Sequence, residues 1–230
     1  MKNEEKGILA NAELLLEKVF NNPRNSHILI GFINDILDLG VTEVDTVENA
    51  YSDKAFCEEN KKPYGKQKHV SVLVKRGCGR QAIIEMQVYG QDLVRDQTLL
   101  NVFMDYAASC VKSGMMNHSE ENPNEEGEYS AQIPVYSVNI LIENDFTKDD
   151  RILRRFTFYD EEHDIQIVNK LNENIVTTVF FEINKPSNGM KKNAKAWVDY
   201  FRTGEVTEEA PEYLQEVRRI AEAQNSTKEE

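Results

Sequence analysis

The chain has 230 residues, of which 40% are hydrophobic and 9% aromatic, an ordinary composition for one folded globular domain with extensions. Its 27 Lys and Arg residues stand against 40 Asp and Glu residues, so the net charge is −13 at pH 7. Such a charge repels a polyanion at long range and argues against nucleic-acid binding by overall charge. The sequence has no apolar stretch of about 18 residues, so no membrane span is expected and the cytoplasm is the expected compartment.

Several kinds of site chemistry lack their sequence patterns. The three cysteines, Cys57, Cys78 and Cys110, are widely spaced, and the four histidines show no metal-ligand spacing. Neither the glycine-rich phosphate-binding patterns nor the G-x-S-x-G pattern of serine hydrolases is present. We therefore expect reduced thiols of no special role and no nucleotide or serine-hydrolase site.

The N-terminal part is predicted to be helical. Apolar residues recur at helical spacing over 8–20 and again over 26–39, where Gly40 ends the pattern. Valines mixed with acids over 41–50 are compatible with a first strand, and the polar, lysine-rich stretch 51–68 is expected to be a loop.

The middle of the chain contains the clearest hairpin pattern. Two strand-like runs, 70–75 and 82–87, are joined by a glycine-containing turn at 76–79. A long helical pattern over about 92–112 follows, and a polar, acidic insertion over 116–132 separates it from the next strand.

The C-terminal half is predicted to alternate between strands and helices. Strands are expected at 134–142, 153–159 and 175–183, and helices at 190–201 and 212–223. This order favours an α/β or α+β fold, with a central sheet on which helices pack.

Glu85 is the best site candidate, because it interrupts the buried-strand run of Ile83, Ile84 and Met86. A buried carboxylate is costly unless it is paired or bound to a metal. Alternation along a strand places Gln87 on the same face, and oxygen ligands of this kind suit Mg²⁺ or Mn²⁺. The alternative is a polar pair on the solvent face of a half-buried strand, which is the more common outcome of a three-residue pattern alone.

Five segments, in their order along the chain, resemble the PD-(D/E)XK nuclease family transposases, also called recombination-promoting nucleases of the Rpn type. The segments are 13–20, 27–37, 83–87, 134–138 and 180–185. The resemblance implies a restriction-endonuclease-like α/β fold, in which helices flank a mixed central sheet. We expect the nuclease-like domain to span 1–186 and a helical C-terminal extension to span 187–230.

The resemblance also implies a site and a reaction. Glu85 would be a ligand of Mg²⁺ or Mn²⁺, Gln87 would occupy the family's lysine position, and Glu13 would be the helix acid that contacts the metal or its water. The implied substrate is DNA, cut by phosphodiester hydrolysis. Where the family carries its metal-binding aspartate, this chain has Ser71, whose hydroxyl lacks the charge.

This departure, together with Gln97 where relatives tend to carry a helix arginine, predicts a degenerate member with weak or absent nuclease activity. Asp92 is an alternative acid for the missing position. The competing prediction is a non-catalytic binding or oligomerising protein on a nuclease fold. A second copy of the chain would then pack on exposed C-terminal helices around Trp197, Tyr200 and Tyr213.

Overall fold

A computed structural model describes most of the chain. The described residues are 3–46, 69–89, 98–99, 102–104, 106–107, 133–143, 146 and 149–226. The expected loop 51–68 and insertion 116–132 lie outside them, as do Asp92 and Gln97. The predictions made for those residues therefore stay predictions.

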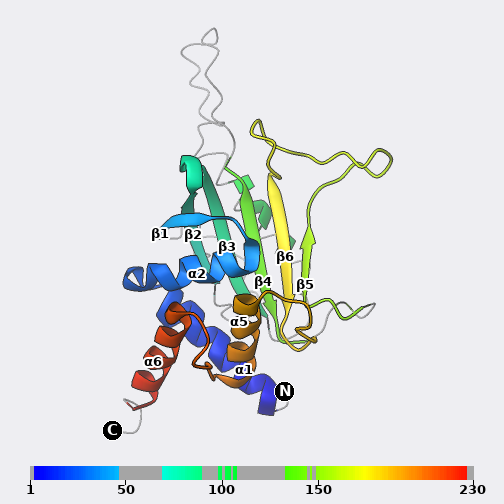
Figure 1. The fold of residues 1–230 in the computed structure, drawn as a ribbon. Helices are drawn as coiled ribbons and strands as arrows, with labels where there is room; N and C mark the ends of the chain where they lie inside the picture. The colour runs from blue at the N-terminus through cyan, green and yellow to red at the C-terminus, as the bar shows by residue number, and fades with distance from the viewer. Residues whose placement is uncertain are drawn as a thin grey trace, which may run out of the picture.

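A six-stranded mixed sheet forms the centre of the protein, with strand order β1-β2-β3-β4-β6-β5 (Figure 1). The strands are β1 Val41–Thr46, β2 His69–Arg76, β3 Gln81–Tyr89, β4 Val135–Leu141, β5 Leu153–Phe156 and β6 Val176–Glu182. Strands β3, β4 and β6 are parallel to one another, whereas β1–β2, β2–β3 and β5–β6 are antiparallel pairs. The predicted hairpin is confirmed as β2 and β3, and the strand expected at 153–159 ends at Phe156.

Among the described residues, four long helices come from the N-terminal and C-terminal parts of the chain. They are α1 Asn3–Leu14, α2 Ser26–Leu37, α5 Lys192–Thr203 and α6 Glu212–Ser226, and α1 continues as a π-helical stretch, Leu15–Phe20. The first helix thus begins earlier than the expected residue 8. Helix α2 ends before residue 39 because Asp38 has a left-handed backbone, with φ of 59°. Within the expected helix 92–112, the described residues are helical.

The helices at both ends of the chain share one principal core with the sheet (Figure 1). Trp197 of α5 is fully buried, Tyr200 is 1% exposed, and the ring of Tyr213 from α6 stacks on Trp197 at 6.2 Å between centroids. The expectation that these aromatic residues lie exposed for a second copy is therefore wrong. These side chains pack against α1 and α2 of the same chain. The predicted domain boundary between residues 186 and 187 stays a prediction.

Asp35 of α2 holds the two C-terminal helices in place. Its carboxylate accepts hydrogen bonds from Trp197 Nε1 at 3.0 Å, from the Tyr213 hydroxyl at 2.5 Å and from Asn193 Nδ2 at 3.2 Å. Burial and the hydrogen bond to Asp35 raise the pKa of Tyr213 well above its ordinary value, so the phenol stays a donor. One acidic residue of the family-like segment 27–37 therefore has a structural role.

Gly31 should not tolerate a side chain, because α2 and α6 approach closely there. A Cβ at Gly31 would lie 2.7 Å from Cε2 of the Tyr213 ring, which its hydrogen bonds hold in place. We expect Gly31→Ala to lower the free energy of unfolding by about 1–3 kcal/mol through overpacking. Urea denaturation measures this, with Gly7→Ala in α1 as the control, where an added Cβ meets nothing within 4 Å. That control should gain about 0.5–1 kcal/mol, and equal effects of both substitutions would contradict the argument.

Candidate functional site

Strand β3 is covered on both faces, and the candidate residues lie on the face away from the principal core. Ile84 and Met86 belong to the principal core, whereas Ile83 packs with Val102, Val135 and Val176 in a second, smaller core. By alternation, Glu85 and Gln87 share the face of Ile83. Glu85 is 5% exposed and Gln87 is fully buried, so the alternative of a polar pair on a solvent face is wrong.

A row of polar residues crosses the sheet at Glu85. The Cα of Glu85 pairs with Ser71 on β2 and with Ser137 on β4, and Ser137 pairs in turn with Thr178 on β6. We call these four residues the polar row. The hairpin register therefore brings Ser71, named by the family resemblance, beside Glu85. Cross-strand partners lie about 4.5–5.5 Å apart at Cβ, so their side chains act on the same small volume.

Asn139 connects the helical residue Thr98 to the polar row, and the sequence reasoning missed it. Its Oδ1 accepts a hydrogen bond from Thr98 Oγ1 at 2.8 Å, while its Nδ2 donates to Ser137 Oγ at 3.2 Å and to the Val179 carbonyl oxygen at 3.1 Å. Thr98, Ser137 and Asn139 are all fully buried. The available signal was the placement of Ser137 and Asn139 two residues apart in an otherwise apolar strand.

Glu13 lies on helix α1, away from Glu85 and Gln87. It is half-buried on α1, whose residues Ile8 and Ala12 pack in the principal core, on the other face of the sheet from Glu85. No three His, Cys, Asp or Glu side chains gather as a metal-binding group within the described residues. A metal role for Glu13 therefore stays a prediction.

The donor set around Glu85 suits a hard divalent cation in kind. It offers the Glu85 carboxylate, the Gln87 amide oxygen and the hydroxyls of Ser71 and Ser137, and Mg²⁺ and Mn²⁺ prefer such oxygen ligands. Among these residues Glu85 alone carries a negative charge. These residues suit a divalent cation by ligand type. They supply one negative charge, from Glu85, and an aspartate at position 71 would supply a second.

Glu182 and Lys185, from the late family-like segment 180–185, form a separate buried group. Glu182 is fully buried, and its Oε2 lies 2.7 Å from Lys185 Nζ and 3.4 Å from Arg154 Nε. The same carboxylate accepts the Phe146 backbone N–H at 2.9 Å, and Lys185 donates to the carbonyl oxygens of Phe146 and Asp149. We call this group the Glu182–Lys185 clamp, because its charges are paired and it fastens the segment after β4.

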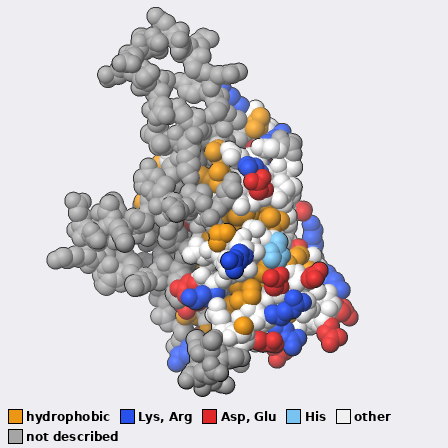
Figure 2. Space-filling model, turned by 90° about the vertical axis from the view of Figure 1, so that its left-hand side faces the viewer, with side chains coloured by type: hydrophobic (Ala, Val, Ile, Leu, Met, Phe, Trp, Pro, Cys, Tyr) orange, Lys and Arg blue, Asp and Glu red, His pale blue; other side chains and the backbone are white. Residues whose placement is uncertain are grey.

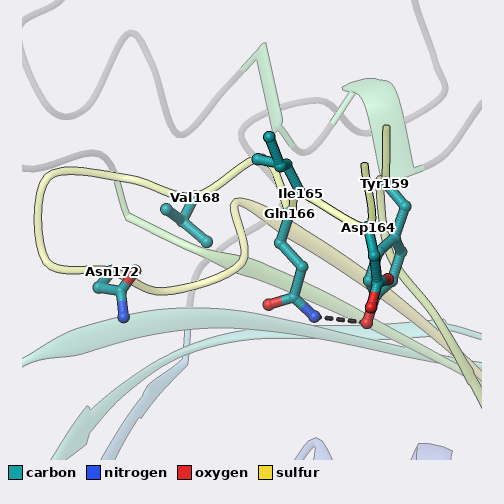
Figure 3. A pocket seen from close by; sticks show the side chains of 6 residues that line it. All are labelled: Tyr159, Asp164, Ile165, Gln166, Val168 and Asn172. Carbon is teal, nitrogen blue, oxygen red and sulfur yellow. Dashed lines mark hydrogen bonds between the residues drawn. The ribbon is translucent and has the colours of Figure 1, made fainter. Parts of the chain in front are cut away.

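A hollow of about 490 Å³ lies elsewhere, on the connection between β5 and β6 (Figure 3). It is lined by Tyr159, Asp164, Ile165, Gln166, Val168 and Asn172. None of the polar-row residues lines it, so we do not assign it to the candidate site.

The described surface on one side of the molecule shows no basic face. Figure 2 shows acidic and basic side chains interspersed over the described surface, with small hydrophobic areas between them. Exposed pairs such as Lys191 with Asp38 at 3.0 Å and Arg218 with Glu222 at 2.8 Å are of this mixed kind. The described residues on this side form no continuous positive surface for a phosphate backbone.

A mixed sheet flanked by helices, with a buried carboxylate and amide two residues apart on a central strand, is consistent with a restriction-endonuclease-like protein. The family model described as PD-(D/E)XK nuclease family transposase matches residues 14–229. The chain therefore belongs to this family, as the resemblance predicted, and the match implies a nuclease-like protein. No curated protein and no solved structure gives a significant match. No helix in the described part of the chain is long and apolar enough to cross a membrane.

Proposed function

We propose that this protein is a divalent-metal-dependent DNA endonuclease whose phosphodiester hydrolysis is weak because Ser71 replaces a catalytic aspartate. The observation that carries the proposal is the position of Glu85: a carboxylate 5% exposed, paired in register with Ser71, on the strand that bears the family's site. Family membership supports DNA as the substrate and a divalent cation as the cofactor.

The proposed roles follow from the chemistry of each side chain. Glu85 would hold Mg²⁺ or Mn²⁺ by its carboxylate, with the amide oxygen of Gln87 on the same face. When bound, such a cation acidifies a water and neutralises charge on the phosphate. Ser71 contributes a neutral hydroxyl, which binds a cation less strongly than a carboxylate does. Glu13 is given no part in this proposal, because α1 packs on the other face of the sheet from Glu85.

A second candidate function is non-catalytic binding by a nuclease fold. The observation that favours it is again Ser71, because a site with one charged ligand loses both cation affinity and charge stabilisation. The net charge of −13 adds to this, since it opposes the approach of DNA.

Cleavage of supercoiled plasmid separates the two candidates. In Mn²⁺ and then Mg²⁺, we expect slow nicking by the unsubstituted protein and none by Glu85→Gln, because the substitution removes the charge and keeps the shape. Glu43→Gln is the matched control, since Glu43 is an exposed strand acid whose side chain pairs with Lys75. Nicking that survives Glu85→Gln reveals a contaminating nuclease. Absence of nicking in every sample favours the binding function.

A further inference from the structure

The connection between β5 and β6, residues 157–175, carries an unusual amount of exposed apolar surface. We call it the arm; Figure 1 shows it extending away from the body of the protein. Seven large hydrophobic side chains are exposed in the described part of the chain, and four of them are on the arm: Tyr159 at 49%, Ile165 at 61%, Ile167 at 53% and Leu171 at 43%. Exposed apolar side chains gathered in this way mark interaction surfaces.

The arm is an ordered ribbon. The backbone N–H of Asp160 donates to the carbonyl oxygen of Ile165 at 2.8 Å, and that of Ile167 donates to Phe158 at 3.2 Å. At its base, Glu173 is 12% exposed and lies 2.8 Å from the guanidinium of Arg76 in β2. These bonds fix the positions of the exposed apolar side chains before any partner arrives, which lowers the entropy lost on binding.

Residues 157–168 of the arm are rich in acids, and the single Lys of the arm is Lys170. Between Phe156 and Asn169 the sequence has four carboxylates, at 160, 161, 162 and 164, and no Lys or Arg. Asp160 is engaged locally, because it accepts backbone N–H bonds from His163 and Glu162, which lower its pKa. The other three acids form no ion pair with any residue that the structure describes. Exposed acids elsewhere, such as Asp38 and Glu222, do have cationic partners.

We propose that the arm binds a segment of a partner protein that carries both apolar and basic side chains. The hollow in the arm places Tyr159 and Asp164 at one end and Val168 and Asn172 at the other, with Ile165 between them (Figure 3). An apolar side chain fits beside Ile165 and Val168, while Asp164 supplies the charge for a neighbouring Lys or Arg. A ribbon of this kind suits an extended segment, which presents alternate side chains to it.

The negative charge of the arm favours a basic protein segment over a second copy of the chain or DNA. A second copy of this chain would bring the same acids to the contact and a further net charge of −13, and DNA would bring phosphates to unpaired carboxylates. A basic protein segment is attracted by the charges that repel the other two. This proposal is independent of the metal site.

Peptide selection tests the proposal without a known partner. Random dodecapeptides displayed on phage are selected on the immobilised full chain and counter-selected on the double variant Ile165→Ser and Ile167→Ser. We expect the recovered peptides to be enriched in Lys or Arg together with apolar residues. Recovery of no binders, or of binders without a basic excess, overturns the proposal.

Fluorescence anisotropy with one recovered peptide then assigns the contact. Binding should weaken at least about 10-fold in the Ile165 and Ile167 double variant and in the triple variant Glu161→Gln, Glu162→Gln and Asp164→Asn. The control is Glu208→Gln with Glu209→Gln, two exposed acids of another loop, which should bind as the unsubstituted protein does. Equal weakening by the control would attribute binding to overall charge. Analytical ultracentrifugation tests for a second copy: a dimer that the Ile165 and Ile167 double variant abolishes would assign the surface to self-association. Either result, equal weakening by the control or such a dimer, overturns the proposal.

Discussion

Ser71→Asp should raise metal-dependent plasmid cleavage by at least about 100-fold over the unsubstituted protein, because it supplies a second charged ligand opposite Glu85. The side chain at 71 is half-exposed, so the larger carboxylate has room beside the buried Glu85. Initial rates of nicking in Mn²⁺, with and without EDTA, measure the effect. Ser71→Asn is the matched control, since it has the same shape and no charge, and it should leave the rate unchanged.

Metal binding by Ser71→Asp should also change the thermal stability of the protein. Without metal, carboxylates at 71 and 85 repel each other, which costs about 1–3 kcal/mol or forces one of them to take up a proton at neutral pH. Mn²⁺ relieves the repulsion, so the melting temperature of Ser71→Asp should be lower than that of the unsubstituted protein in EDTA and should recover in Mn²⁺. If Mn²⁺ changes neither the melting temperature nor the cleavage of this variant, Glu85 is not a metal ligand.

Glu182→Gln should lower the free energy of unfolding by about 3–5 kcal/mol, the largest stability loss that we expect from a polar substitution in this chain. Lys185 is 4% exposed, so removing the Glu182 charge leaves a buried cation without its nearest carboxylate. The Arg154 side chain, 9% exposed, also loses one of its two carboxylate partners and keeps Asp149. The Phe146 N–H bond to Glu182 would also weaken. Urea denaturation at neutral pH measures the change.

An exposed ion pair provides the comparison. Asp38 and Lys191 are 3.0 Å apart with side chains 75% and 73% exposed, and Asp38→Asn keeps a residue type that tolerates the left-handed backbone there. Solvent screens this pair, so the substitution should change stability by no more than about 0.5 kcal/mol. If Glu182→Gln lowers the free energy of unfolding by less than about 1 kcal/mol, water reaches the Glu182–Lys185 clamp and solvates its charges.

Local patterns in the sequence were enough for much of the sheet and for the candidate residues of the site. The hairpin of β2 and β3 follows from two β-branched runs around a glycine turn. The family resemblance named Ser71, and the structure supplied the register that places it opposite Glu85. Period-2 alternation placed Gln87 on the face of Glu85, but the pattern left open whether that face is buried, and a solvent-facing pair was the more common expectation.

Contacts between residues far apart in the chain were not predictable in this way. The burial of Trp197 and Tyr200 depends on α5 packing against α1 and α2, more than 150 positions earlier in the chain, and an amphipathic pattern does not say what covers its apolar side. The hydrogen bond between Asn139 and Thr98 is of the same kind, because it needs β4 to meet a segment about 40 positions earlier in the chain.

The sequence by itself determined most of the strands and helices, the family, and Glu85 and Ser71 as site candidates, since each depends on spacing over a few residues or on the order of motifs. Only the tertiary structure decided that Glu85 lies under a second core, that Glu182 serves a buried clamp, and that the C-terminal aromatic residues are covered while the arm is exposed. Burial depends on which surfaces meet after the chain has folded. The hydrophobic free energy is proportional to the apolar area removed from water, and a local sequence pattern does not give that area.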